Sequence, residues 1–256
     1  MTHPHPGLPL EGEGVSGLSG GASLVDHIQA MDWEGLTADL DADGYAILSP
    51  LVSPAQCASL NSLYEIDALF RSRVVMARHG FGRGEYKYFA YPLPELVLTL
   101  RTALYLQLVG IANRWNESMN IAVRYPDEHE EFLDRCHLAG QSRPTPLLLR
   151  YEEGDYNCLH QDLYGEHVFP LQIAFLLSNP EQDFTGGEFV LTEQRPRMQS
   201  RTTVVPLVQG SAVVFAVNNR PVRGTRGSYR VKMRHGVSRV RSGKRHTLGI
   251  IFHDAA

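Results

Sequence analysis

The spacing of apolar residues divides this chain into two parts. Up to about residue 143, apolar positions recur in several segments at the spacing of a helix. After Pro144, short runs rich in Val, Ile, Leu and Phe alternate with turns rich in Gly, Asn and Pro. The pattern therefore predicts a helical amino-terminal part and a β-rich carboxy-terminal part.

Helix signals are clearest where polar capping residues precede apolar ones. Ser53 followed by Pro54 is a favourable helix start, because serine caps the free backbone N–H groups and proline is tolerated in the first turn. Helices are expected at 24–41, 53–64, 94–115 and within 127–138, with a short strand at 45–48.

The carboxy-terminal part predicts an antiparallel sandwich or barrel, because it contains many short strands separated by turn residues. We expect an α+β fold with a mainly β core, in which a single domain over 23–256 combines a mostly helical support (23–143) with a β-rich core (144–256). Residues 1–22 are rich in Gly and Pro and are expected to form a flexible tail. The strands are expected at 145–151, 156–162, 171–177, 187–192, 202–207, 211–217, 229–235, 236–240 and 245–253.

Charge is distributed unevenly along the chain. The net charge is −4, yet the segment from Arg195 to Arg245 contains 11 Arg and 2 Lys and no Asp or Glu. Such a block is either a solvated surface or a binding surface for an anionic macromolecule. We expect it to contact a nucleic-acid backbone, with Arg195, Arg197 and Arg201 as candidate phosphate contacts.

The apolar runs are too short to span a bilayer, and the amino terminus lacks the basic start and apolar segment of a secretory signal. The three cysteines have no metal-type spacing, so reduced thiols are expected. These features predict a cytoplasmic protein that does not contact a membrane.

The stretch LLLRYEEGDYNCLHQD, residues 147–162, contains the first candidate chemistry. Residues i and i+2 of a strand point to the same face, so His160 and Asp162 would present an imidazole and a carboxylate side by side. They could be two metal ligands, an acid/base pair, or a chance occurrence. Candidates for a third ligand in the carboxy-terminal part are His235, His246 and His253.

His235 is favoured, because Arg245 follows it ten residues later on a predicted strand. Two histidines and one carboxylate form the facial triad of non-haem Fe(II) oxygenases, which leaves three positions for a 2-oxo acid and dioxygen. The remote carboxylate of a bound 2-oxoglutarate needs a buried counter-charge, which a planar arginine supplies well. Alternatively, His160 is a structural strand residue and Arg245 an ordinary surface cation.

The same residues carry a resemblance to a known family. The carboxy-terminal part resembles the 2-oxoglutarate/Fe(II)-dependent dioxygenases, with their double-stranded β-helix (jelly-roll) core, and RYEEGDYNCLHQD resembles the corresponding stretch of AlkB-type nucleic-acid demethylases. The resemblance implies that His160, Asp162 and His235 bind Fe(II), that Tyr151 hydrogen-bonds 2-oxoglutarate, and that Arg245 pairs with its far carboxylate. Two features depart from AlkB: a leucine stands at position 149 where asparagine is usual, and the His235–Arg245 spacing is shorter, closer to that of prolyl hydroxylases.

A longer resemblance covers about residues 30–255. The stretches RHGFGRGEYKYFAYPLP, GGEFVLTEQRPRMQSR and MRHGVSRVRSGKRHTLGIIFHDA are similar to a bacterial family of nucleic-acid oxygenases proposed to act on damaged DNA. It implies that 2-oxoglutarate and O2 are converted to succinate and CO2 while a substrate C–H bond is hydroxylated, most simply in the oxidative dealkylation of alkylated nucleic acid. Hydroxylation of a protein side chain or small molecule is the alternative reaction, and a non-catalytic nucleic-acid-binding jelly roll is the alternative class.

The glycine-containing stretch HGFGRGEYKYFAY, residues 79–91, has two interpretations. It is either a flexible loop or a lid over the substrate, in which tyrosines stack on a base and basic residues meet phosphate. The candidate substrate residues here are Arg78, Arg83, Tyr86, Lys87 and Tyr88, with Tyr91 as a further stacking candidate.

Overall fold

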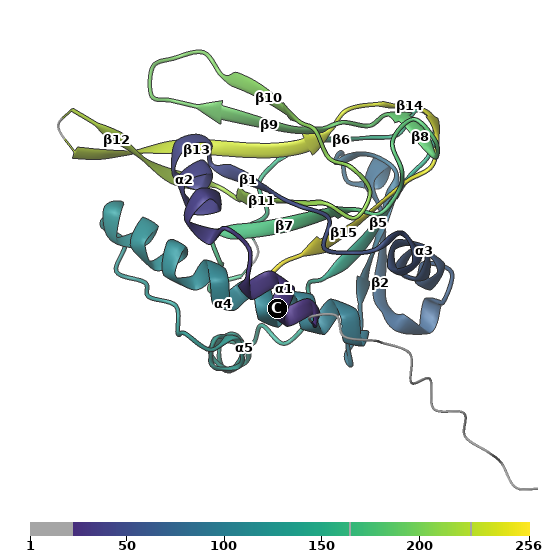
Figure 1. Cartoon of the computed structure of the whole chain (residues 1–256), viewed down its shortest axis with the longest axis horizontal. Helices are drawn as coiled ribbons and strands as arrows, with labels where there is room; N and C mark the ends of the chain where they lie inside the picture. The colour runs from purple at the N-terminus through teal and green to yellow at the C-terminus, as the bar shows by residue number, and fades with distance from the viewer. Residues whose placement is uncertain (1–22, 164, 226) are drawn as a thin grey trace, which may run out of the picture.

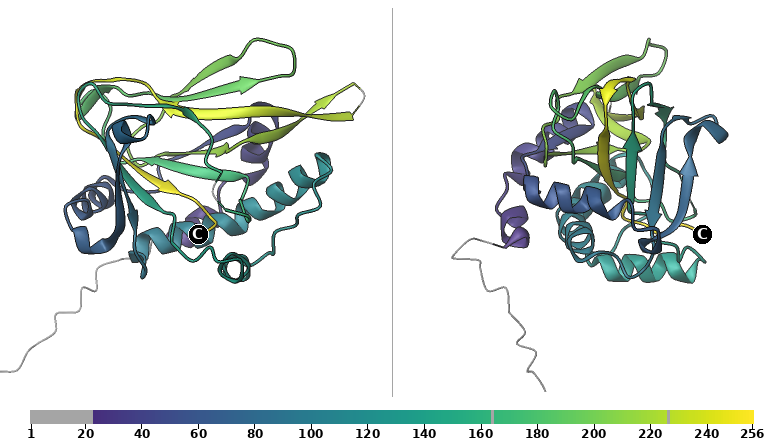
Figure 2. Two further views of the ribbon diagram at one scale, coloured as in Figure 1. Left: turned by 180° about the vertical axis from the view of Figure 1, so that it is seen from behind. Right: turned by 90° about the vertical axis from the view of Figure 1, so that its right-hand side faces the viewer.

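The computed structural model describes residues 23–163, 165–225 and 227–256; the tail expected at 1–22 lies outside this range. The described part has three layers: a six-stranded sheet, a seven-stranded sheet, and helices packed on the outer face of the larger sheet (Figure 1). The side view in Figure 2 shows the same order of layers. This arrangement of two sheets and a layer of helices confirms the predicted α+β fold with a mainly β core.

The helices begin at residues with capping side chains where the sequence offers them. Ser53 accepts a hydrogen bond from the Gln56 backbone N–H at 3.2 Å, as the sequence predicted. The single helix expected at 24–41 is instead two helices, because the Asp32 side chain accepts from Gly35 N–H and caps a new helix. The helices are α1 (Leu24–Gln29), α2 (Trp33–Asp43), α3 (Pro54–Leu63), α4 (Glu95–Ser118) and α5 (His129–Leu138).

The seven-stranded sheet combines strands from both halves of the chain. Its central strands come from the carboxy-terminal part, whereas β1, β2 and β4 come from the amino-terminal part and form its two edges. In spatial order the strands are β1 (Tyr45–Leu48), β11 (Ala212–Ala216), β7 (Leu171–Leu176), β15 (Arg245–Ile250), β5 (Leu147–Tyr151), β4 (Glu85–Phe89) and β2 (Phe70–Val75).

The six-stranded sheet lies over the inner face of the larger sheet (Figure 1). Among the strands from β5 onward, β5, β7, β11 and β15 belong to the larger sheet, and β6, β9, β10 and β13 belong to the smaller one. The smaller sheet runs β10 (Arg201–Val205), β9 (Phe189–Gln194), β13 (Gly227–Val237), β6 (Tyr156–His160) and β3 (Gly82–Arg83), with β12 (Asn219–Gly224) paired to β13; β8 (Phe184–Gly186) and β14 (Val240–Gly243) form a separate pair.

Both faces of the larger sheet are covered, which explains its continuous apolar strands. In β7, Ile173 and Phe175 pack towards the helices, whereas Ala174 and Leu176 pack towards the smaller sheet. The molecule therefore has one core between helices and sheet and a second between the two sheets. The site described below opens from the second core.

One expectation about elements was wrong, and one was incomplete. The part over 23–143 contains the five helices α1 to α5, but its strands β1, β2 and β4 also extend the larger sheet at both edges. The strands expected separately at 229–235 and 236–240 are one long strand, β13, which is followed by β14. β13 pairs with β9 without interruption from Lys232 to Val237, across the predicted break.

Among the described residues, α4 is long and apolar enough, by length and composition, to cross a membrane. More than half of its most apolar window, 56%, is buried inside the protein. Leu100, Leu104 and Leu108 belong to the core between helices and sheet, so packing accounts for the hydropathy of this helix.

Candidate metal and cosubstrate site

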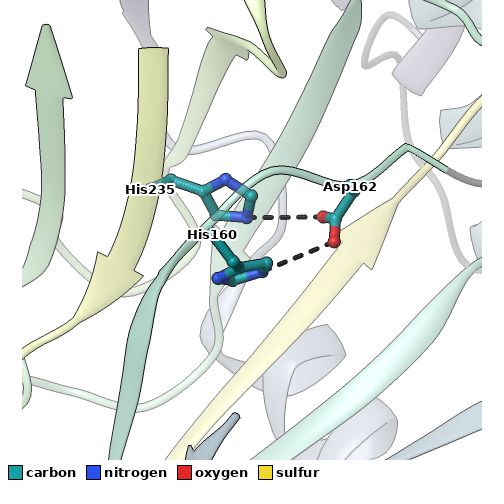
Figure 3. Close-up of side chains that lie close together, drawn as sticks. All are labelled: His160, Asp162 and His235. Carbon is teal, nitrogen blue, oxygen red and sulfur yellow. Dashed lines mark ion pairs between the residues drawn. The ribbon is translucent and has the colours of Figure 1, made fainter. Parts of the chain in front are cut away.

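Three side chains from two adjacent strands of the smaller sheet converge on one point. His160 is the last residue of β6, Asp162 follows it, and His235 lies on β13 directly opposite His160. One potential ligand atom from each residue lies within 4.8 Å of the others, and Figure 3 shows the two imidazole rings beside the carboxylate. The strand expected to reach Asp162 ends at His160, yet both side chains point to the same centre.

The hydrogen bonds of His160 orient its ring for metal binding. Its Nδ1 lies 2.8 Å from the backbone oxygen of Cys158. A proton on Nδ1 donates to that carbonyl and leaves the lone pair of Nε2 facing the centre, which is the usual arrangement of a metal-binding histidine. The Nε2 atoms of His160 and His235 each lie 3.4 Å from a different oxygen of Asp162.

Charge in this cluster favours an ionised carboxylate. Burial by itself would raise the pKa of Asp162, but hydrogen bonds from His160 and His235 hold that pKa well below its usual value. Burial lowers the pKa of His235. For His160, burial works in the same direction, but the Asp162 carboxylate outweighs it and raises the pKa. A carboxylate between two imidazoles is a donor set that suits Fe(II).

Arg245 lies at one end of the same cavity and has no carboxylate partner among the described residues. It is 1% exposed, its guanidinium donates to the Thr247 hydroxyl, and its Nε has no hydrogen-bond partner. Burial lowers its pKa to about 10. A buried cation without a counter-charge is costly, so this position fits an anionic ligand.

Tyr151 faces the same region from the neighbouring strand. It pairs with Arg245 in the β5–β15 register and is fully buried. Burial raises its pKa to about 12, so the phenol keeps its proton and can donate a hydrogen bond. The side-chain amide of Asn157 lies 3.4 Å from the phenol oxygen.

A cavity of about 260 Å³ joins these groups. His160, Asp162 and His235 line it from the smaller sheet, while Arg245 and Tyr151 line it from the larger sheet. Three metal donors and an unpaired buried guanidinium in one cavity fit an Fe(II) ion with 2-oxoglutarate. The remaining walls include aromatic and aliphatic side chains, among them Phe81, Tyr86, Tyr88, Leu147, Leu149, Phe189, Phe215 and Ile251.

Tyr86 and Tyr88 also line this cavity, but they are not part of a loop or lid. They lie on β4, which pairs with β2 and β5 inside the larger sheet. The alternation in Glu-Tyr-Lys-Tyr-Phe over 85–89 is a strand signal that the sequence interpretation missed. The two tyrosines are therefore fixed walls of the cavity.

The three basic candidates from this stretch have different surroundings. Lys87 is 6% exposed, and its ammonium donates to the Tyr64 backbone oxygen and to Asp67, at 2.7 Å each. The expectation that Lys87 meets phosphate is therefore corrected. Arg78 and Arg83 are exposed and flank Phe81, which lines the cavity and is 46% exposed. Neither arginine lines the cavity itself, and the Arg83 guanidinium lies 3.7 Å from Asp155.

Arg195, Arg197 and Arg201 do not line the cavity. They lie at the end of the β9–β10 hairpin, where the Arg195 guanidinium is 2.7 Å from Glu193 and that of Arg201 is 3.3 Å from Asp43. Buried Arg220 also pairs with Glu193. These three candidate phosphate contacts therefore lie away from the cavity.

Sequence reasoning also missed Gln172. It lies on β7 within an apolar run and lines the cavity. A single polar residue inside the run Leu-Gln-Ile-Ala-Phe-Leu was the available signal, because buried polar residues need a reason to be there.

Comparisons with known proteins identify the family of this chain. Residues 84–255 match the model of the Oxygenase-NA family, described as an oxygenase "catalysing oxidative methylation of damaged DNA". Two uncharacterized proteins of Mycobacterium tuberculosis, from strains CDC 1551 and H37Rv, are each 46% identical over 198 residues, covering 77% of this chain and 80% of theirs. A prolyl 4-hydroxylase structure from Phytophthora capsici has the same fold, with a TM-score of 0.50 at 17% identity over 89% of this chain and 63% of that one.

Proposed function

The chain belongs to the Oxygenase-NA family and is a 2-oxoglutarate/Fe(II)-dependent dioxygenase, and we propose that its substrate is alkylated nucleic acid. It uses Fe(II), 2-oxoglutarate and O2. The observation that carries the site assignment is the cavity in which three metal donors lie near an unpaired, buried Arg245. We assign His160, Asp162 and His235 as the iron ligands.

In the proposed site, Arg245 binds the far carboxylate of 2-oxoglutarate through a charge-assisted, bidentate pair. Tyr151, with its proton retained, donates a hydrogen bond to the same cosubstrate. Both side chains are buried, so water does not compete with either contact. The pair therefore sets the position and direction of the cosubstrate relative to the three ligands.

Bound Fe(II), with 2-oxoglutarate and O2, supplies the oxidant that hydroxylates a C–H bond and yields succinate and CO2. The chain contributes a cavity whose apolar walls exclude water from that bond. If the hydroxylated carbon is an N-methyl group, the N–CH2–OH product breaks its C–N bond, releases formaldehyde and leaves the nitrogen with a proton. The result is oxidative dealkylation.

We also infer that the core is a double-stranded β-helix. The alternation of β5, β6, β7, β9, β10, β11, β13 and β15 between two facing sheets supports this topology. One domain over 23–256 and a cytoplasmic location remain part of the proposal.

Two features support a nucleic-acid substrate. Arg230, Lys232 and Arg234 alternate with buried residues along β13. Lys232 and Arg234 are exposed on the outer face of the smaller sheet, whereas the Arg230 guanidinium donates to the Met119 backbone oxygen at 2.6 Å. Within the described residues, none of these three bases forms an ion pair with a carboxylate. The same strand, β13, also carries the proposed iron ligand His235. A cationic strand next to a cavity lined by tyrosines is the combination that holds a phosphate backbone and a base.

Mass spectrometry provides the direct test. The purified protein is incubated with Fe(II), ascorbate and 2-oxoglutarate, and with oligonucleotides that each carry one methylated base. Loss of one methyl group from an oligonucleotide, with stoichiometric succinate, is the expected result. Turnover of peptides or small molecules, with none of the oligonucleotides, would contradict the proposal.

The second candidate is hydroxylation of a protein side chain or a small molecule. It is favoured by the short spacing between His235 and Arg245, which resembles that of prolyl hydroxylases. The product distinguishes the candidates, because a hydroxylated carbon that is not attached to nitrogen stays in place as a gain of one oxygen atom.

A further inference from the structure

Gln161 stands between two of the proposed iron ligands, at the point where strand pairing stops. His160 is the last residue of β6 and pairs with His235 on β13. The register of these two strands ends there, so Asp162 lies outside their hydrogen-bonded ladder. A residue outside regular structure has more backbone freedom unless other contacts restrain it. The position of the Asp162 carboxylate therefore depends on contacts other than strand pairing.

The side chain of Gln161 supplies such contacts. Its Nε2 donates to the Met233 backbone oxygen at 2.8 Å and to the Asn218 side-chain oxygen at 2.7 Å. A backbone carbonyl can only accept, so the contact with Met233 identifies this end of the Gln161 amide as the NH2 group. The two acceptors match the two hydrogens of that group.

The two partners of Gln161 are also joined to each other. The Met233 backbone N–H donates to the Asn218 backbone oxygen at 2.6 Å. Met233 lies two residues before His235 on β13, and Asn218 directly precedes β12, which pairs with β13. The Gln161 amide therefore ties the segment of the first two ligands to the strand that carries the third.

The geometry of the centre makes such a restraint useful. The three potential ligand atoms lie within 4.8 Å of one another, and the two oxygens of Asp162 face different imidazoles at 3.4 Å each. Consecutive Cα atoms are about 3.8 Å apart, so a restraint on Gln161 also limits movement of Asp162. Small displacements of a ligand weaken a metal site, because the donor atoms must keep a defined distance and direction.

We propose that Gln161 is a positioning residue for the metal centre. Its amide holds the His160–Asp162 segment against β13 and thereby keeps the Asp162 carboxylate beside the two imidazoles. In this role Gln161 acts through the backbone of Asp162 and is not itself a ligand. The inference rests on the proposed iron site and deepens it, and it does not depend on the identity of the substrate.

The test measures metal binding with Gln161→Met, which keeps the length of the side chain but donates no hydrogen bond. Co(II) replaces Fe(II) in the titration, because it binds similar donor sets and its visible absorption reports their geometry. The variant should bind Co(II) about tenfold more weakly than the wild type, as is usual when a group that orients a ligand is lost. Its Co(II) absorption spectrum should also change.

Gln209→Met is the matched control. Gln209 is half-buried, as Gln161 is, and its Nε2 donates to the Leu177 backbone oxygen at 3.0 Å. It does not line the cavity. Both variants lose hydrogen bonds and should melt below the wild-type temperature. Only Gln161→Met should change the affinity and the spectrum of bound Co(II).

A second variant tests the contact with Asn218. Asn218→Ala removes one of the two acceptors, so it should weaken Co(II) binding less than Gln161→Met does. The double variant should bind Co(II) no more weakly than Gln161→Met alone, because the shared contact is already lost. Independent losses of stability would instead add.

Wild-type affinity and spectrum in Gln161→Met would overturn the inference. Equal losses of Co(II) affinity in Gln161→Met and Gln209→Met would overturn it too, because they would show a general effect of stability. Additive losses in the double variant would also contradict it. A wild type that binds no Co(II), or an Asp162→Ala variant that binds it as tightly as the wild type, would instead refute the proposed iron site.

Discussion

Arg245 and Tyr151 face each other across the β5–β15 pair, with the guanidinium carbon 5.7 Å from the tyrosine ring centroid. Neither side chain is accessible, and the cation has no carboxylate partner in the described residues. The protein thus maintains a costly charge at one end of its cavity. That cost is explained if an anionic cosubstrate offsets it.

Replacing Arg245 with methionine should therefore separate folding from cosubstrate binding. The ligand-free variant should be at least as stable as the wild type, because an unpaired buried charge has been removed. At 2-oxoglutarate one hundred times above its dissociation constant, the wild type should gain about 2.7 kcal/mol, and the variant should gain almost none. Thermal denaturation with and without 2-oxoglutarate measures both effects.

Arg223→Met, on exposed β12, is the matched control and should respond to 2-oxoglutarate as the wild type does. If Arg245→Met is still stabilised to the wild-type extent, the anchor is a different arginine, such as Arg239 or Arg241.

Substituting any of the three proposed ligands by alanine should abolish succinate formation and lower Fe(II) affinity, while the circular dichroism spectrum stays unchanged. Each variant removes one of three donors from the same centre. His27→Ala, an exposed histidine on α1, is the control. Full activity in His160→Ala or Asp162→Ala would show that the assignment is wrong.

Metal binding should depend on pH through His160. Its pKa is raised in the metal-free protein, where burial opposes protonation but the Asp162 carboxylate outweighs it. A metal must displace that proton, so Fe(II) affinity should be full above the raised pKa and fall as the pH drops through it. Titration with Fe(II) under anaerobic conditions, from pH 8 to pH 5, tests this. Constant affinity over that range would contradict the role of His160.

Asp254→Asn should destabilise the protein by about 3–5 kcal/mol at neutral pH, because it leaves buried Arg101 without a counter-charge. Their side chains are 2.8 Å apart and fully buried. Burial would raise the pKa of Asp254, but Arg101, His137 and Tyr91 lower it overall.

The contribution of Asp254 should also have a defined pH range. A lowered folded-state pKa means that the stability is present above the unfolded value of about 3.9 and is lost as the pH falls through the folded value. Urea unfolding should show a constant difference between wild type and Asp254→Asn down to about pH 4. A difference that vanished near pH 6 would contradict the pairing.

Nucleic-acid binding should depend on salt through the outer face of β13. Each phosphate contact contributes about 0.7–0.9 to the slope of log affinity against log salt. Arg234→Ala should lower this slope by the contribution of about one phosphate contact. Arg195→Ala removes a cation that is already paired with Glu193, so it should lower the slope less. Fluorescence anisotropy of a labelled single strand gives both slopes. Equal effects would mean that the β9–β10 hairpin also contacts the strand.

Local sequence was sufficient for part of this structure. The cap at Ser53 and the alternation at Tyr45–Leu48 depend on neighbouring residues, so the helix start and the strand were predicted correctly. The ligand chemistry was also accessible, because His160 and Asp162 lie two residues apart and Arg245 follows His235 at a recognisable spacing.

Other features depend on which distant segments lie together. Lys87 is a surface base by composition, yet β4 turns it towards Tyr64 and Asp67. The acid-free block was expected to contact a nucleic-acid backbone through Arg195 among others, but buried Glu193, just outside it, pairs with both Arg195 and Arg220.

The sequence by itself determined the chemistry of the centre, because the identity and spacing of the ligands are local properties of the chain. Only the tertiary structure decided the environment of each charge. It leaves Arg245 without a carboxylate partner among the described residues, pairs Lys87 with Asp67, and places Gln172 in the wall of the cavity. The reason is physical: pairing and burial set the free energy of a charged or polar group, and both depend on contacts between residues far apart in sequence.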